Sequence, residues 1–101
     1  MSVFCKYVML LLRVKHCSFE SSLWKNRREQ RISHLKNILE GGVLLSKSKE
    51  EVVELLGDEY NHYHVDQWKY FVRDIKSLPY KIYLEIDFHN NMVSVCRVKL
   101  V

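Results

Sequence analysis

Residues 80–89 alternate between apolar and polar or aromatic side chains, and this alternation constrains the fold more than any other feature of the chain. A period of two residues is typical of a β-strand that buries one face against a core. The apolar positions are Tyr80, Ile82, Leu84, Ile86 and Phe88. The pair Asn90-Asn91 follows directly, and asparagine tolerates the left-handed backbone that a two-residue hairpin turn requires. We therefore expect a hairpin whose last strand runs from Met92 to about Lys99.

Pairing across this turn predicts which residues of the hairpin share a face. Phe88 is expected opposite Val93, and Ile86 opposite Val95, on the face that meets the core. The other face is expected to be mostly solvated, as antiparallel sheets often are on one side. That second face carries Glu85, Asp87, Ser94 and Cys96.

A further strand precedes the hairpin. Trp68, Tyr70 and Val72 are separated by single residues that are mostly charged, which predicts a strand over this segment. Pro79 lies at the first residues of the following strand, where a missing backbone N–H is tolerated. The three strands together predict an antiparallel meander.

Two short helices are expected before the sheet. Asn26–Glu29 has the spacing of a capping box, and a helical apolar repeat follows it as far as Gly41-Gly42. Ser48–Glu51 has the same spacing, and Gly57 ends the second helix after about two turns. A helix this short is not stable alone in water, so it must be packed against something. We expect an α+β fold, with both helices on one face of the sheet, in a single domain over residues 19–101.

The segment Ser48–Gly57 resembles the short helix of the SmpA/OmlA (BamE-like) lipoprotein domains, which are related in fold to the β-lactamase-inhibitor domain. In those domains a loop, a Trp/Tyr-containing strand and a final hairpin follow, as Trp68–Tyr70 and Leu84–Phe88 do here. Phe19–Lys25 is similar to the lead-in of small bacterial lipoproteins of this kind. The resemblance covers roughly Phe19 to Val98, and it implies an envelope protein that binds another protein and has no catalytic residues.

Residues 1–18 are interpreted as a separate leader, a degenerate signal or lipoprotein segment. Its apolar run, Tyr7–Leu12, is far shorter than the roughly 20 helical residues that span a bilayer. Basic residues between Arg13 and His16 occupy the positions where small cleavage-site residues belong. Cys17 follows at about the distance of a lipoprotein's acceptor cysteine, so it is the candidate for lipidation and membrane association. The cysteine count is three, which indicates no disulfide framework.

The chain is mildly basic, with 16 Lys and Arg against 12 Asp and Glu and a formal net charge of +4. The excess lies in residues 1–50, which hold ten basic and four acidic side chains. An anionic partner would therefore meet the first predicted helix. The basic residues of that helix are Arg27, Arg28, Arg31 and Lys36. Nucleic acid is disfavoured on the solvated sheet face, because acidic residues share that face with Tyr83, the one candidate stacking ring.

The loop between the second helix and the first strand holds the remaining candidate site residues. His62 and His64 are two residues apart, so in an extended segment they would point the same way and share zinc or copper with a carboxylate. They are weak metal candidates, and we expect no metal or other cofactor. Tyr60, Tyr63 and Trp68 are the candidate protein-binding side chains, since aromatic residues are enriched at interfaces. Trp68 is also expected in the core or at its edge.

Catalysis is not expected. An enzyme would need a nucleophile beside a positioned base, or paired carboxylates in a cleft. The serines near the first helix have no glycine-rich elbow beside them, and Gly41-Gly42 is explained as a helix stop. We therefore expect no small-molecule substrate.

The function expected from the sequence is non-enzymatic protein–protein binding, in a small bacterial envelope protein. Its candidate surface is the loop Asp58–Gln67 with the exposed face of the sheet. The alternative is a cytosolic accessory domain that binds an anionic partner, nucleic acid or an acidic surface, through the basic first helix. The location is the cell envelope if the leader functions, and the cytoplasm otherwise.

Overall fold

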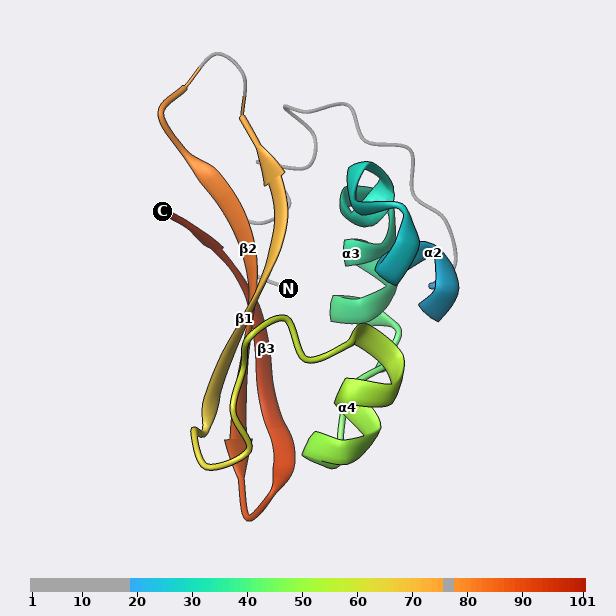
Figure 1. Cartoon of the computed structure of the whole chain (residues 1–101), viewed down its shortest axis with the longest axis vertical. Helices are drawn as coiled ribbons and strands as arrows, with labels where there is room; N and C mark the ends of the chain where they lie inside the picture. The colour runs from blue at the N-terminus through green and yellow to red at the C-terminus, as the bar shows by residue number, and fades with distance from the viewer. Residues whose placement is uncertain (1–18, 76–77) are drawn as a thin grey trace.

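The computed structural model describes residues 19–75 and 78–101. Its helices lie on one face of an antiparallel sheet with strand order β1-β2-β3 (Figure 1). The elements in chain order are α2 (Ser21–Asn26), the 3-10 helix η1 (Arg28–Gln30), α3 (Arg31–Glu40), α4 (Lys49–Leu56), β1 (Gln67–Asp74), β2 (Lys81–His89) and β3 (Met92–Leu100). The predicted α+β fold, with short helices before a three-stranded meander, is confirmed. The expected leader, with Cys17, lies outside the described residues.

The core lies between the helices and the inner face of the sheet, by which we mean the face that the helices cover. Two tryptophans form its centre: Trp24 of α2 stands edge-on to Tyr70, and Trp68 stands edge-on to Phe88. Except for Tyr80 and Val95, the alternate strand residues that the sequence predicted to be inward are buried. They include Trp68, Tyr70, Val72, Ile82, Leu84, Ile86 and Phe88. Within the described part of the chain, no helix is both long enough and apolar enough to cross a membrane.

Helix α4 begins and ends where the sequence predicts. The Ser48 hydroxyl accepts a hydrogen bond from the Glu51 amide at 3.2 Å, and the Ser48 amide donates to the Glu51 carboxylate at 3.0 Å. This reciprocal pair is the predicted capping box. Gly57 ends the helix with a φ of 83°, a left-handed value that a residue without a Cβ adopts at little cost.

The predicted capping box at Asn26 is wrong. Asn26 is the last residue of α2, and α3 begins only at Arg31, after η1. Gln30 precedes α3 and makes no side-chain cap. The reason is tertiary: Trp24 is fully buried, and the chain must turn after it before the inward face of α3 can reach the same core.

The hairpin turn is as predicted, because both Asn90 and Asn91 have left-handed φ values, 51° and 63°. Phe88 pairs with Val93, which confirms that part of the register. The pairing expected between Ile86 and Val95 is wrong.

A β-bulge in β3 accounts for the register error. Ser94 is an extra residue in that strand, and its hydroxyl donates to the Asp87 carbonyl at 3.1 Å. Beyond the bulge, Asp87 pairs with Val95 and Ile86 pairs with Cys96. Val95 therefore becomes exposed on the outer face, and Cys96 packs against the core.

The outer face of the sheet, which is turned away from the helices, is less exposed to solvent than expected. Glu85 at its centre is only 2% exposed, because Arg97 and Lys99 of β3 close over it. Cys96 leaves this face, and burial raises the pKa of its thiol to about 11. The start of β2 also differs: the strand begins at Lys81, and Pro79 and Tyr80 are exposed residues before it.

Candidate interaction surface

Residues 57–66 join α4 to β1 and are called the 57–66 loop below. Tyr60, in this loop, is 95% exposed. Its φ is 65° and that of Glu59 is 43°, both in the left-handed region that side chains with a Cβ rarely adopt. Such a backbone persists only where surrounding contacts hold it, and it is concentrated at functional sites.

The first contact that holds the loop is an ion pair beneath Tyr60. Arg31 of α3 is 3% exposed, and its Nη1 lies 2.6 Å from Oε1 of Glu59. The same nitrogen donates to the Phe71 carbonyl at 2.8 Å, while the Phe71 amide donates to Oε2 of Glu59 at 2.7 Å. Arg31 also donates through Nε to the Trp24 carbonyl at 2.9 Å. One arginine therefore ties α2, the 57–66 loop and β1 together.

The second contact lies on the other side of Tyr60. The side-chain amide of Asn61 donates to the Lys69 carbonyl at 3.1 Å and accepts from the Lys69 amide at 3.2 Å. Glu59 and Asn61 thus bind the backbone of β1 at Phe71 and Lys69, two residues apart. Tyr60 stands between these two attachment points.

The rest of the loop is also bonded to the core. The Trp68 indole N–H donates to the carbonyls of His62 and Val65, both at 2.9 Å. Buried Lys49 donates to the Tyr63 carbonyl and lies 2.8 Å from the Asp66 carboxylate. These bonds make the loop a fixed platform whose shape does not depend on a ligand.

The end of the loop next to α4 is fixed by a buried tyrosine. The Tyr70 hydroxyl donates to the Gly57 carbonyl at 2.6 Å. Burial raises the pKa of Tyr70 far above its ordinary value, so the hydroxyl stays protonated and remains a donor. The hydrogen bond is therefore kept across the whole physiological pH range.

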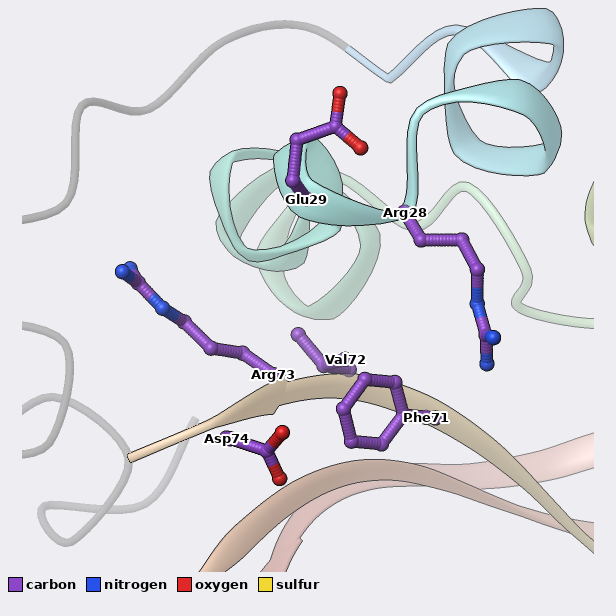
Figure 2. Close-up of a pocket in the computed structure, with 6 residues that line it drawn as sticks. All are labelled: Arg28, Glu29, Phe71, Val72, Arg73 and Asp74. Atoms are coloured by element: carbon purple, nitrogen blue, oxygen red, sulfur yellow. The ribbon is translucent and has the colours of Figure 1, made fainter. Parts of the chain in front are cut away.

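A cleft of about 600 Å³ adjoins the loop between η1 and the end of β1 (Figure 2). Arg28 from η1 places its guanidinium 5.2 Å from the centre of the Phe71 ring and 3.9 Å from Glu59. Figure 2 shows Arg28 and Arg73 extending toward opposite sides of the cleft, so their guanidinium groups do not converge on one ligand atom. The cleft lies beside Glu59 of the 57–66 loop, and the side chains that line it show no catalytic arrangement.

The outer face of the sheet carries a charged network. Arg97 donates to the buried Glu85 carboxylate at 2.7 Å and lies 2.8 Å from Asp87. The hydrogen bond from Arg97 lowers the pKa of Asp87, which stays ionised. The acidic residues that were expected to repel an anion from this face are therefore neutralised by Arg97 and Lys99.

The structure separates the predicted site residues. Tyr60 is almost wholly exposed and Tyr63 half exposed, but Trp68 is 1% exposed and fills the core, so its assignment to a partner surface is wrong. Its ring is needed inside because it packs against Phe88 and, edge-on, against Tyr63. Arg31 was predicted to belong to a basic surface, but it is buried in an ion pair with Glu59 and is not part of that surface.

His62 and His64 do stand close, with ring centres 5.5 Å apart and the rings stacked. They lie in a turn rather than in the extended segment that was expected. Over residues 19–75 and 78–101, no group of three His, Cys, Asp or Glu side chains could hold a metal ion, so the carboxylate ligand of that hypothesis is not found with them.

The sequence analysis missed the residues that fix the loop: Glu59, Asn61 and Lys49. Glu59 and Asn61 flank the most exposed tyrosine, and this pattern of a polar residue on each side was the only signal available. It does not distinguish a solvated loop from one bonded to a strand. Among family models, curated proteins and solved structures, none matches this chain.

Proposed function

We propose that this chain is a non-enzymatic protein-binding module and that Tyr60 and Tyr63 are the centre of its partner surface. The observation that carries the proposal is the display of Tyr60, 95% exposed, on a loop whose flanking side chains are both bonded to β1. An exposed ring in a left-handed conformation does not stabilise the monomer. It can strengthen the binding of a partner, because a ring that is already held in place loses little conformational freedom on binding.

The composition around Tyr60 supports the same proposal. Tyrosine and arginine are the residue types over-represented among those that dominate binding energy at protein interfaces. Here Tyr60 and Tyr63 are exposed on the 57–66 loop, and Arg28 lies 3.9 Å from Glu59 of that loop. This arrangement favours a protein partner over a small ligand.

The test compares two substitutions of the same kind in different places. A binder recovered on the immobilised full chain is purified, and its dissociation constant is measured against the wild-type chain, Tyr60→Ala/Tyr63→Ala and Tyr80→Ala. Tyr80 is the matched control, since it is an exposed tyrosine outside the 57–66 loop. The loop variant is expected to bind at least about tenfold more weakly, and Tyr80→Ala within about twofold of wild type. Equal affinity of the loop variant and the control would refute the proposal.

An envelope location is part of the proposal, on the strength of the resemblance to SmpA/OmlA domains. It requires a leader that is processed to a lipid-modified Cys17. The intact mass of the native protein, measured by cell compartment, tests this. An unmodified chain that keeps residues 1–18 in the cytosolic fraction would remove the envelope location and leave the partner surface to be tested separately.

The alternative, an anionic partner on the first helices, has narrower support. Arg27, Arg28 and Lys36 remain exposed there, while Arg31 is buried. Micromolar protein that shifts an oligonucleotide in a salt-dependent way would favour this alternative.

A further inference from the structure

The two edges of the sheet differ. β1 and β3 are the edge strands, and an edge strand exposes backbone N–H and C=O groups to any chain that can pair with it. On β1 these groups are occupied: Asn61 binds both groups of Lys69, while Glu59 and Arg31 bind those of Phe71. The 57–66 loop therefore closes the β1 edge from Lys69 to Phe71 to a further strand.

On β3 the described residues cover only the beginning of the strand. The Val93 amide donates to the Lys47 carbonyl at 2.8 Å, beside a bridge between Ser48 and Met92. At the other end, Val101 exchanges both backbone hydrogen bonds with Lys81 and so faces β2. Because an antiparallel strand alternates between paired and outward residues, the outward residues can be counted back from Val101. They are Leu100, Val98 and Cys96, and no described residue bonds to their outward N–H and C=O groups.

The side chains along this open edge indicate what would pair with it. On the outer face, Arg97 and Lys99 pair with Glu85 and Asp87 of β2 but are still 40% and 47% exposed, and β3 itself contains no acidic residue. On the inner face, Cys96, Val98 and Leu100 continue the core out to the edge. A new strand would therefore place every second side chain beside a cation and the others beside apolar groups.

We propose that the outer edge of β3, from Cys96 to Leu100, binds an extended peptide in which acidic and apolar side chains alternate, as a fourth strand of the sheet. Backbone hydrogen bonds would supply the attachment, and the alternate side chains would supply the selectivity. This surface lies at the opposite edge of the sheet from Tyr60, so it is independent of the partner surface proposed above.

The same charges disfavour two other occupants. A second copy paired antiparallel about Val98 would set Arg97 opposite Lys99 of that copy, and like charges opposite each other destabilise a strand pair. Residues 1–18 contain no Asp or Glu, and they carry Lys6, Arg13 and Lys15. The leader is therefore also a poor match for this edge.

The test follows amide hydrogen exchange in the full chain on addition of a synthetic peptide of about seven residues in which glutamate and valine alternate. We expect exchange to slow about tenfold or more at the amides of Cys96, Val98 and Leu100, with no change at Lys69 and Phe71. A peptide with lysine in place of glutamate, and the glutamate peptide with alternate backbone nitrogens methylated, are expected to have no such effect.

A pair of charge variants tests the selectivity. Lys99→Gln is expected to weaken binding of the glutamate peptide about twofold to fivefold, and Lys69→Gln, the same charge loss at the closed edge, is expected to leave it unchanged. Equal effects of the two variants, equal binding of the lysine peptide, or no slowing at the three amides would each overturn the proposal. Amides already protected without peptide would overturn it as well. Protection that grows with protein concentration would then indicate a second copy, and protection independent of concentration would indicate the chain's own leader.

Discussion

Removing the carboxylate of Glu59 should destabilise the whole domain, although Glu59 lies in a surface loop. The carboxylate accepts from Arg31 at 2.6 Å and from the Phe71 amide at 2.7 Å. Hydrogen bonds to charged groups contribute about 1.5–3 kcal/mol each. The Glu59 side chain is 18% exposed, so water can replace part of what is lost, and Arg31 keeps its bonds to the carbonyls of Trp24 and Phe71. We therefore expect Glu59→Ala to lower the free energy of unfolding by about 2–4 kcal/mol.

Two comparisons isolate the ion pair. Glu29→Ala is the matched control, because Glu29 is an exposed glutamate of η1, and its loss should change the free energy of unfolding by about 0.5 kcal/mol or less. Glu59→Gln keeps one acceptor and loses the charge, so it should fall between the control and Glu59→Ala. The left-handed backbone at position 59 destabilises a glutamate and an alanine equally, so its cost cancels when Glu59→Ala is compared with the wild-type chain.

Urea unfolding of the three variants and the wild-type chain, with the slope m unchanged, gives the required free energies. The corresponding fall in the midpoint temperature for Glu59→Ala is about 10 °C or more for a domain of this size. If Glu59→Ala proves as stable as Glu29→Ala, the ion pair does not hold the loop. The physical basis for treating the loop around Tyr60 as a fixed platform would then be lost.

Three further predictions concern local features. Tyr60→Asn should raise the free energy of unfolding by about 0.5–1 kcal/mol in urea titration, because asparagine tolerates the left-handed backbone better; a loss of stability would show that the ring packs on the domain. Ser48→Ala should lower the free energy of unfolding by about 1 kcal/mol through loss of the capping box. An unchanged free energy would mean that the start of α4 is held by packing alone. The folded-state pKa values of Glu50 and Glu51 are lowered chiefly by backbone hydrogen bonds, and that of Asp87 by Arg97. Their contribution to stability is therefore present above about pH 4.5 and is lost as the pH falls further. Urea titrations at neutral and acidic pH would detect this loss. A free energy of unfolding that does not change with pH would contradict it.

Signals between neighbouring residues account for most of the local conformations of this chain. The alternation from Ile82 to Phe88, the Asn90-Asn91 turn, and the capping box at Ser48 with the stop at Gly57 were predicted correctly. Each of these signals acts over a few neighbouring residues, because backbone preference and side-chain periodicity are local properties. Together they were sufficient for the α+β meander with its helices on one face.

Which polar side chains are buried depends on contacts between segments that are far apart in the sequence. Arg31 meets Glu59 and Phe71, which are 28 and 40 residues away in the sequence. Glu85 is buried because Ser94 shifts the register of β3 by one residue, which brings Arg97 opposite it. The sequence does not distinguish a charged residue that is solvated from one that is buried in an ion pair beneath a loop. The distinction depends on contacts that exist only once the distant segments have come together, and those contacts turn an ordinary polar loop into a fixed display of Tyr60.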